Sequence, residues 1–144
     1  MYPPKFDYVR AGSIDEAMSL LKDNEEAKLL AGGHSLIPTL KLRLAAPSML
    51  IDISGIDDLK GLNKSNGVIH MGSLTTHAQV EASDDLPAAM TEAAGWIGDP
   101  QVRNRGTVGG SIAHADPASD LPTVLTALGA TINVAGVDGA RSVS

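Results

Sequence analysis

Two glycine doublets, at residues 32–33 and 109–110, constrain the fold of this chain more than any other feature of its sequence. The first doublet follows a short apolar run and precedes a segment with helical spacing. Glycine permits positive φ angles and leaves room for a ligand against the backbone. A strand that ends in a glycine turn at the start of a helix presents free N–H groups and the positive end of the helix dipole, and both favour an anion. Each doublet therefore indicates either a phosphate-binding turn or an ordinary tight turn.

The first glycine segment (residues 29–36) reads Leu-Leu-Ala-Gly-Gly-His-Ser-Leu. Ser35 adds a hydroxyl group that can donate to an anion or cap the following helix. The segment is not the Rossmann fingerprint, because the third glycine and its spacing are missing. It is not a P-loop either, since no Gly-Lys-Ser/Thr follows. From this segment alone, an anion site and a tight turn with a serine cap stay equal alternatives.

A second segment, residues 105–120, contains the other doublet, and we call its residues 107–111 the second glycine segment. It overlaps the end of residues 98–110, which we predict to be a loop. Loops of this length in compact domains are usually functional or disordered. The doublet is again flanked by hydroxyl residues, so two such segments could hold the two ends of a pyrophosphate. The formal net charge of −6 opposes an anion at long range, so local backbone dipoles would have to attract it. Arg103 and Arg105 either assist or are merely solvated.

The composition fits a folded domain or part of a larger one. The chain has 144 residues, of which 43% are hydrophobic and 19% are charged, and this excludes the low-hydrophobicity kind of disorder. It has no cysteine, so a disulfide, a thiolate nucleophile and a cysteine-ligated cluster are excluded. No apolar stretch approaches about 18 residues and no secretory segment is evident. With its acidic charge, we expect a cytoplasmic protein that binds neither nucleic acid nor anionic membranes.

The apolar pattern predicts an alternation of strands and helices in the first part of the chain. A capping box of Ser13 and Glu16 starts the first helix. The expected elements are a strand at 6–8, a helix at 13–22, a strand at 28–31, a helix at 36–44 and a strand at 49–53. This order suggests a small parallel α/β unit. We place a boundary near residue 55, with residues 1–55 and 56–144 as two subdomains.

Beyond the boundary, residues 54–67 are rich in turn formers and are expected to form turns. The remaining expected elements are a strand at 68–72 after an Asn-Gly turn, helices at 75–82, 86–96 and 120–128, a strand at 131–135, and a hairpin turn at 136–139 followed by a partner strand. The chain therefore ends as if in the middle of a domain.

The other polar residues predict no catalytic site and no metal site. The four histidines share no ligand spacing, and His114 with Asp116 would supply two ligands from one loop, too few for a metal. No serine lies in a Gly-x-Ser-x-Gly elbow. His77 is expected on a helix away from both glycine segments. Trp96 and Ile97 are expected in the core, with cover of a planar ligand as the alternative.

Taken together, the two glycine segments resemble those of the FAD-binding medium subunits of molybdenum hydroxylases, especially the carbon monoxide dehydrogenase type. The resemblance begins at residues 6–8 (Phe-Asp-Tyr), continues through 31–38 (Ala-Gly-Gly-His-Ser-Leu-Ile-Pro) and includes 99–110 (Asp-Pro-Gln-Val-Arg-Asn-Arg-Gly-Thr-Val-Gly-Gly). It implies an α+β fold of the vanillyl-alcohol-oxidase/PCMH type, in which two α/β subdomains hold FAD. Family members continue well past residue 144, so the resemblance implies a truncated fold whose C-terminal domain is absent.

The resemblance also implies which residues contact the cofactor. Ile97 matches an apolar position near the flavin, and Asp120 matches a carboxylate that contacts FAD. Ser111 stands where the family often has asparagine, which shortens the side chain but keeps a hydrogen-bonding group. The residues that match the two pyrophosphate loops are Leu29, Leu30, Ala31, Gly32, Gly33, His34, Ser35 and Leu36 in the first, and Thr107, Val108, Gly109, Gly110 and Ser111 in the second.

The function implied by the resemblance is electron transfer through FAD. Substrate would be oxidised on a large molybdopterin-binding subunit, and electrons would pass through 2Fe-2S clusters of a small subunit to FAD and on to an external acceptor. The three subunits would form a heterotrimer, single or dimerised. The lack of cysteine and of a catalytic triad fits a subunit that leaves substrate chemistry to its partner. A truncated, non-catalytic nucleotide-binding or assembly module and a self-contained flavin oxidase stay open as alternatives. Carbon monoxide, an aldehyde and an N-heterocycle are all compatible substrates.

Overall fold

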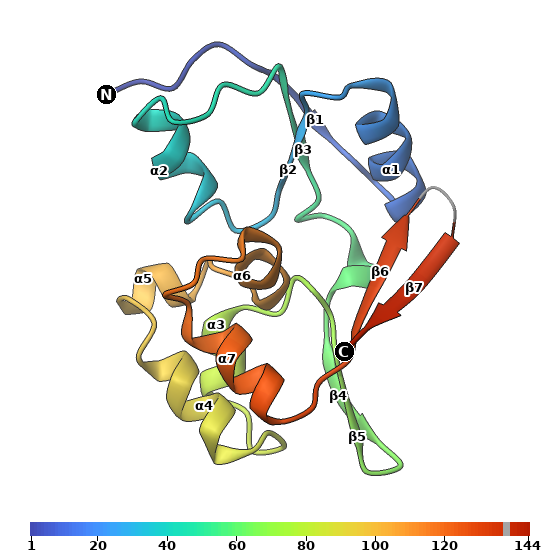
Figure 1. Ribbon diagram of the computed structural model, residues 1–144, viewed down its shortest axis with the longest axis vertical. Helices are drawn as coiled ribbons and strands as arrows, with labels where there is room; N and C mark the ends of the chain where they lie inside the picture. The colour runs from blue at the N-terminus through green and yellow to red at the C-terminus, as the bar shows by residue number, and fades with distance from the viewer. Residues whose placement is uncertain (137–138) are drawn as a thin grey trace.

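The computed structural model describes residues 1–136 and 139–144, and begins with a three-stranded parallel sheet in the order β1-β3-β2 (Figure 1). The strands are β1 (Asp7–Arg10), β2 (Lys28–Leu30) and β3 (Met49–Asp52), and they are connected by α1 (Ile14–Asp23) and α2 (Leu36–Lys41). Tyr8 and Leu29 lie beside Leu50 and Ile51 of the central strand. The parallel α/β unit expected from the sequence is confirmed.

Local capping explains where α1 begins and where α2 ends. Ser13 Oγ accepts from the N–H of Glu16 at 3.1 Å, while the Glu16 carboxylate accepts from the N–H of Gly12 at 2.7 Å, one residue before the position used in a standard capping box. Helix α2 ends three residues earlier than expected. Arg43 takes a positive φ of 58°, and the N–H of Leu44 donates to the Thr39 carbonyl at 3.0 Å, which closes the helix.

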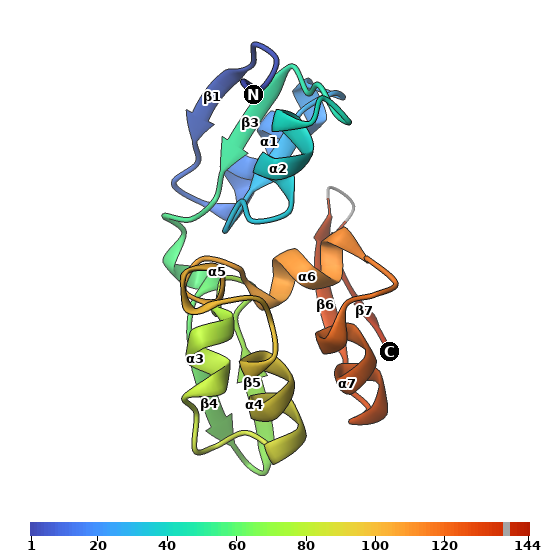
Figure 2. The same cartoon turned by 90° about the vertical axis from the view of Figure 1, so that its left-hand side faces the viewer.

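The second part of the molecule is a group of short helices packed on one another (Figure 2). These are α3 (His77–Glu81), α4 (Ala88–Gly95), α5 (Pro100–Arg103), α6 (Val108–His114) and α7 (Asp120–Ala127). Their common core is formed by Val80, Met90, Ala94, Val108 and Leu121, all buried. A separate cluster of buried small and branched side chains, centred on Ile51 and Ile53, lies beneath the parallel sheet and extends to Leu74.

Two antiparallel hairpins complete the structure. Strands β4 (Leu62–Ser65) and β5 (Val68–Met71) are joined by Asn66 and Gly67, whose φ angles of 51° and 78° fit the expected Asn-Gly turn. Strands β6 (Ile132–Gly136) and β7 (Gly139–Val143) are the expected closing strand and its partner, with Gly136 opposite Gly139. The turn predicted between them includes Val137 and Asp138, which lie outside the described residues. No helix in the described ranges has the length and apolarity needed to span a membrane.

Two stretches predicted as irregular are ordered, so those predictions were wrong. Residues 54–67 contain a 3₁₀ helix (Asp57–Leu59) and the polar strand β4, whose exposed side chains lack the apolar alternation of a half-buried strand. Residues 98–110 contain α5 and the start of α6. Asp99 and Thr107 cap these helices by accepting from the N–H groups of Val102 and Gly110. Side-chain caps therefore outweigh the glycine and proline content that suggested a loop.

Trp96 was expected in the core but is 78% exposed. On α4 the buried face is set by Met90 and Ala94, and Ile97 packs against the same cluster. Trp96, six residues after Met90, is rotated well away from that face because successive helical residues turn by about 100°. Only the Ile97 half of the prediction was correct, and this side chain is partly buried.

Candidate functional site

The turn after β2, which holds the first glycine segment, lies against the chain that enters α6 (Figure 1). A methyl group added to Gly32 would lie 1.9 Å from the carbonyl oxygen of Arg105 and 3.1 Å from the Cα of Gly106. The turn after β2 therefore rests directly on the chain that leads into α6. Glycine is required at position 32 because another backbone occupies the space of a side chain.

The first glycine segment presents unused hydrogen-bond donors. Gly33 has a φ of +76°, as expected for a glycine turn. Within residues 1–136 and 139–144, the N–H groups of Gly33, His34 and Ser35 make no hydrogen bond. The Ser35 hydroxyl does not cap α2, and its side chain is exposed. This turn can therefore offer several donors to one anion, whereas the alternative of a serine-capped turn is not supported.

The second glycine segment differs, because its backbone donors are already used. Val108 and Gly109 donate to the carbonyls of Thr75 and Ser73, each at 2.9 Å. Gly110 donates to Thr107 Oγ1 at 3.1 Å, and Ser111 donates to the Thr107 carbonyl at 3.0 Å. The expectation that this segment presents free backbone N–H groups was wrong, since two of these amides hold α6 to residues 73–75 and the other two bond to Thr107 at the start of α6.

The doublet at 109–110 serves packing and helix geometry. A methyl group on Gly109 would lie 2.5 Å from Ser73 Cβ and 2.8 Å from the Ser73 carbonyl oxygen. Gly110 lies in the first turn of α6 and has no positive φ, so the expectation of a left-handed backbone fails here. A methyl group on Gly110 would lie 2.8 Å from the Thr107 hydroxyl that caps the helix.

Residues 73–77, which lead from a turn into α3, run behind the second glycine segment. Thr76 forms an isolated antiparallel bridge with Thr107, and the N–H of His77 donates to the Gly106 carbonyl at 3.0 Å. Thr75 is buried, and its hydroxyl donates to the Gly61 carbonyl at 3.0 Å. The position of the second segment is therefore set by a stretch about 30 residues earlier in the chain, through contacts that local sequence patterns do not report.

His77 lies against the second glycine segment, which contradicts the expectation that it is remote from both. Its side chain is only 4% exposed, and Nε2 lies 3.3 Å from Ser111 Oγ. Burial lowers the pKa of His77 below the ordinary histidine value, which favours the neutral imidazole. Sequence reasoning missed this residue, although one signal was available. His77 and Val80 are three residues apart on one helix face, and the apolar partner indicates that this face is buried.

Arg103 was expected either to assist an anion or to be solvated, and the structure contradicts the solvated alternative. Its side chain is 14% exposed, and Nη1 donates to the carbonyls of Ile97 and Gly98 at 3.2 and 3.3 Å. Nε lies 2.8 Å from Glu81 Oε2, as an ion pair without hydrogen-bond geometry. Arg103 thus ties α5 to α3 and to the end of α4. Arg105 contributes its carbonyl to the contact at Gly32, and its side chain is exposed.

The other candidate residues are distributed around these segments. Leu29 and Leu30 belong to β2, and Ala31 packs on the cluster beneath the sheet. Leu36 begins α2, and the exposed His34 ring places Nδ1 3.1 Å from the Gly32 carbonyl. Ile97 packs on the helical core, and the exposed Asp120 is the first residue of α7. Among the described residues, no hydrogen bond joins Ile97 or Asp120 to either glycine segment, although the core on which Ile97 packs includes Val108.

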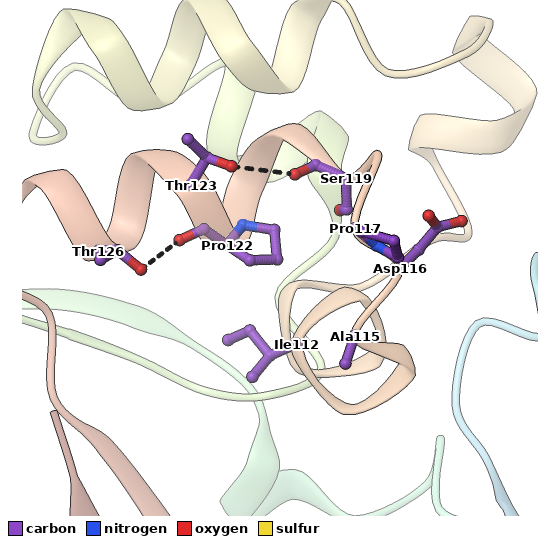
Figure 3. A pocket seen from close by; sticks show the side chains of 8 residues that line it. All are labelled: Ile112, Ala115, Asp116, Pro117, Ser119, Pro122, Thr123 and Thr126. Carbon is purple, nitrogen blue, oxygen red and sulfur yellow. Dashed lines mark hydrogen bonds between the residues drawn. The ribbon is translucent and has the colours of Figure 1, made fainter.

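An open groove lies between α6 and α7, next to the second glycine segment (Figure 3). It has a volume of about 450 Å³, and Ile112 and Pro122 line it from the two helices. Asp116 also lines it, although its Oδ1 accepts from the N–H of Ala118 at 2.9 Å and so stabilises the connecting turn. Asp120 begins the helix that forms one wall. The groove is therefore continuous with α6, on which Ser111 lies.

Residues 4–144 match a protein family described as the FAD binding domain in molybdopterin dehydrogenase. The chain belongs to this family. Membership confirms the resemblance to FAD-binding medium subunits, the α+β fold class and FAD as the expected cofactor.

Relatives of this FAD-binding domain have different substrates in their names. The chain is 47% identical to the 6-hydroxypseudooxynicotine dehydrogenase complex subunit alpha of Paenarthrobacter nicotinovorans, covering 99% of the chain and 50% of the relative. It is 47% identical to the glyceraldehyde dehydrogenase medium chain of Sulfolobus acidocaldarius, covering 99% and 52%. A solved carbon monoxide dehydrogenase from Hydrogenophaga pseudoflava superposes with a TM-score of 0.95 at 44% identity, covering 99% and 51%. The chain spans about half the length of these relatives.

Proposed function

We propose that this domain binds FAD as part of the electron-transfer subunit of a molybdenum-containing hydroxylase. The observation that carries the proposal is the contact of Gly32 with Arg105 and Gly106, just before the second glycine segment, with three unused N–H groups on the other side of the contact, in the first segment. Turns of this kind bind anions through backbone dipoles, and so they suit a pyrophosphate in a chain whose net charge is −6. The groove beside α6 can accommodate a further part of the cofactor.

In this proposal the residues have distinct tasks. Gly33, His34 and Ser35 supply N–H donors, and Ser111 supplies a hydroxyl group from the second segment. The remaining matched residues of both segments shape the backbone, while Ile97 and Asp120 approach the cofactor from the helical part. FAD supplies the redox chemistry when bound, and the chain binds and orients it. Residues 1–55 and 56–144 would act as the two subdomains that enclose it.

The proposed partners follow the same scheme. A large molybdopterin-binding subunit would oxidise the substrate, and a small 2Fe-2S subunit would pass electrons to FAD, in a heterotrimer located in the cytoplasm. Two of the relatives named above are equally identical to this chain, at 47%, but their names refer to chemically different compounds. This supports a division of labour in which another subunit selects the substrate. The external electron acceptor would receive electrons from the bound flavin.

The test is the absorption spectrum and subunit composition of the protein purified from its native source. We expect flavin bands in a ratio near one FAD per subunit, together with copurifying chains that contain molybdenum and iron–sulfur clusters. A colourless preparation that takes up no added FAD would support the alternative of a non-catalytic module. A yellow protein that oxidises a substrate with no partner chain would support the flavin oxidase. Either result overturns the proposal.

A further inference from the structure

His77 is a buried polar residue to which the proposed function gives no task. We propose that His77 positions the Ser111 hydroxyl so that its hydrogen is free to donate to a phosphate oxygen of FAD. The inference rests on the proposed function and concerns how one of its donors is held. His77 acts through Ser111 and is therefore a positioning residue.

The imidazole is fixed where it can do this. Its side chain is 4% exposed and Nε2 lies 3.3 Å from Ser111 Oγ. The Gly106 backbone closes the other side, because a methyl group added there would lie 2.7 Å from His77 Cδ2 and 2.9 Å from Nε2. The backbone N–H of His77 is bonded to the Gly106 carbonyl at 3.0 Å. Both the ring and its attachment point are thus held against the chain that enters α6.

The direction of the His77–Ser111 hydrogen bond follows from the other ring nitrogen. His77 Nδ1 is buried and has no partner in the described structure. A buried N–H without an acceptor is rarer than a buried acceptor without a donor. The neutral tautomer with the hydrogen on Nε2 is therefore favoured, and Nε2–H donates to Ser111 Oγ. The hydroxyl then accepts from His77 and keeps its own hydrogen for another acceptor.

This arrangement matters because Ser111 is an unusual donor within its segment. The N–H groups of residues 108–111 all have acceptors inside the fold, as described above. The Ser111 side chain is partly exposed, whereas Thr107 is buried and its hydroxyl accepts from Gly110. A ligand that reaches the second segment therefore meets the Ser111 hydroxyl, and a hydroxyl that donates to His77 instead would be lost to that ligand.

A double-mutant cycle in the purified holoprotein, stripped of flavin and titrated with FAD, tests the coupling. The readout is the dissociation constant from flavin fluorescence, with circular dichroism to show that each variant is folded. We expect Ser111→Ala to weaken FAD binding about fivefold, the loss of one hydrogen bond. His77→Leu should weaken it by a similar factor. The double variant should be no weaker than either single variant, since both changes remove the same donor.

Conservative replacement separates positioning from packing. His77→Gln places an amide N–H near the position of Nε2 and should restore binding to within about twofold of the wild type. If His77→Leu does not fold, His77→Asn replaces it, because the shorter amide fills the site without reaching Ser111. If the losses of FAD affinity in the two single variants multiply in the double variant, the role of His77 is overturned. The same holds if His77→Gln binds FAD as weakly as His77→Leu. Either result leaves the proposed function standing. A wild-type protein that binds no FAD would overturn the proposed function and this inference together.

Discussion

The four glycines of the two doublets are required for different physical reasons. Gly33 needs a left-handed backbone, with a φ of +76°. Gly32 and Gly109 have no positive φ, but each touches another backbone so closely that a methyl group has no space. Gly110 is helical and lies against the hydroxyl group that caps its own helix. Of these four glycines, only Gly33 combines a left-handed backbone with an N–H group that makes no hydrogen bond in the described structure.

Replacing Gly33 by valine should remove FAD while leaving the fold intact. A β-branched side chain disfavours positive φ, and its Cβ would lie 3.1 Å from Leu30 Cδ1 and from Ile37 Cγ1, so the turn that presents the free amides must change shape. The flavin-to-protein ratio after gel filtration checks this. Gly129→Val is the matched control, because Gly129 has a φ of +66° and nothing within 4 Å of an added methyl group. It carries the same backbone strain away from the site, and it should keep its flavin. Equal flavin loss in both variants would contradict the assignment.

Gly32→Ala should destabilise the protein as well as weaken FAD binding. The added methyl group would lie 1.9 Å from the Arg105 carbonyl oxygen, so the first glycine segment and the chain that enters α6 must separate. Overpacking of this kind typically costs about 1–3 kcal/mol. Thermal unfolding measures the loss, with Gly12→Ala as the control, since its methyl group would make an ordinary 3.5 Å contact with Glu16. An unfolding temperature for Gly32→Ala equal to that of the control would mean that the contact is not tight.

At the scale of elements, short helices are held in register by single side chains. Helix α5 has four residues and α6 has seven, too few to be stable alone in water. Asp99 and Thr107 cap these helices, and residues 73–77 pair with the chain between α5 and α6. Arg103 adds a connection from α5 to α3 and to the end of α4. Together these contacts fix the position of the second glycine segment.

Arg103→Leu should cost more stability than Glu81→Gln. Removing the guanidinium leaves the carbonyls of Ile97 and Gly98 without their donor, at about 1–3 kcal/mol. Glu81 is 41% exposed and its loss removes an ion pair that water partly replaces, worth about 0–1 kcal/mol. Urea unfolding of both variants gives the two free energies. A larger loss for Glu81→Gln would show that the ion pair, and not the carbonyl bonds, holds α5.

The sequence predicts the elements whose signals are local. Alternating apolar runs and caps located the parallel sheet and its two helices, and the Asn-Gly pair located the β4–β5 turn. Residues 98–110 were misjudged because glycine and proline were read as breakers, while the capping roles of Asp99 and Thr107 were not recognised. The burial of His77 depends on a backbone segment about 30 residues away. Such a contact leaves no mark on local periodicity, so the partner of Ser111 was not predicted.

For the whole molecule, titration of two residues ties stability to pH. Burial lowers the pKa of His77, so the unfolded chain takes up a proton more readily than the folded protein. For Asp52, burial raises the pKa, but hydrogen bonds from Tyr8 and Ser54 outweigh it and the net pKa is lowered. Asp52 thus contributes stability at neutral pH that is lost only as pH falls through its folded pKa, below the ordinary aspartate value of about 3.9.

The free energy of unfolding should therefore fall as pH drops below about 6.5, the ordinary histidine pKa, and level off below the folded pKa of His77. Urea unfolding at pH 7.5 and at lower values down to about pH 5 measures this loss. His77→Gln cannot be protonated and should show a flatter profile over the same range. An identical slope in the wild type and in His77→Gln would assign the dependence to another group.

The contact between Gly32 and the Arg105 carbonyl also has an evolutionary consequence. Gly32 and Gly109 are held by neighbouring backbone, so selection for folding alone is enough to keep them. A descendant of this domain that had lost its cofactor would still carry both glycines for as long as it folded. The first changes to accumulate after such a loss should appear at Gly33 and Ser111, whose special features face a ligand. Among distant homologues, these two positions should therefore separate flavoproteins from their colourless descendants better than Gly32 and Gly109.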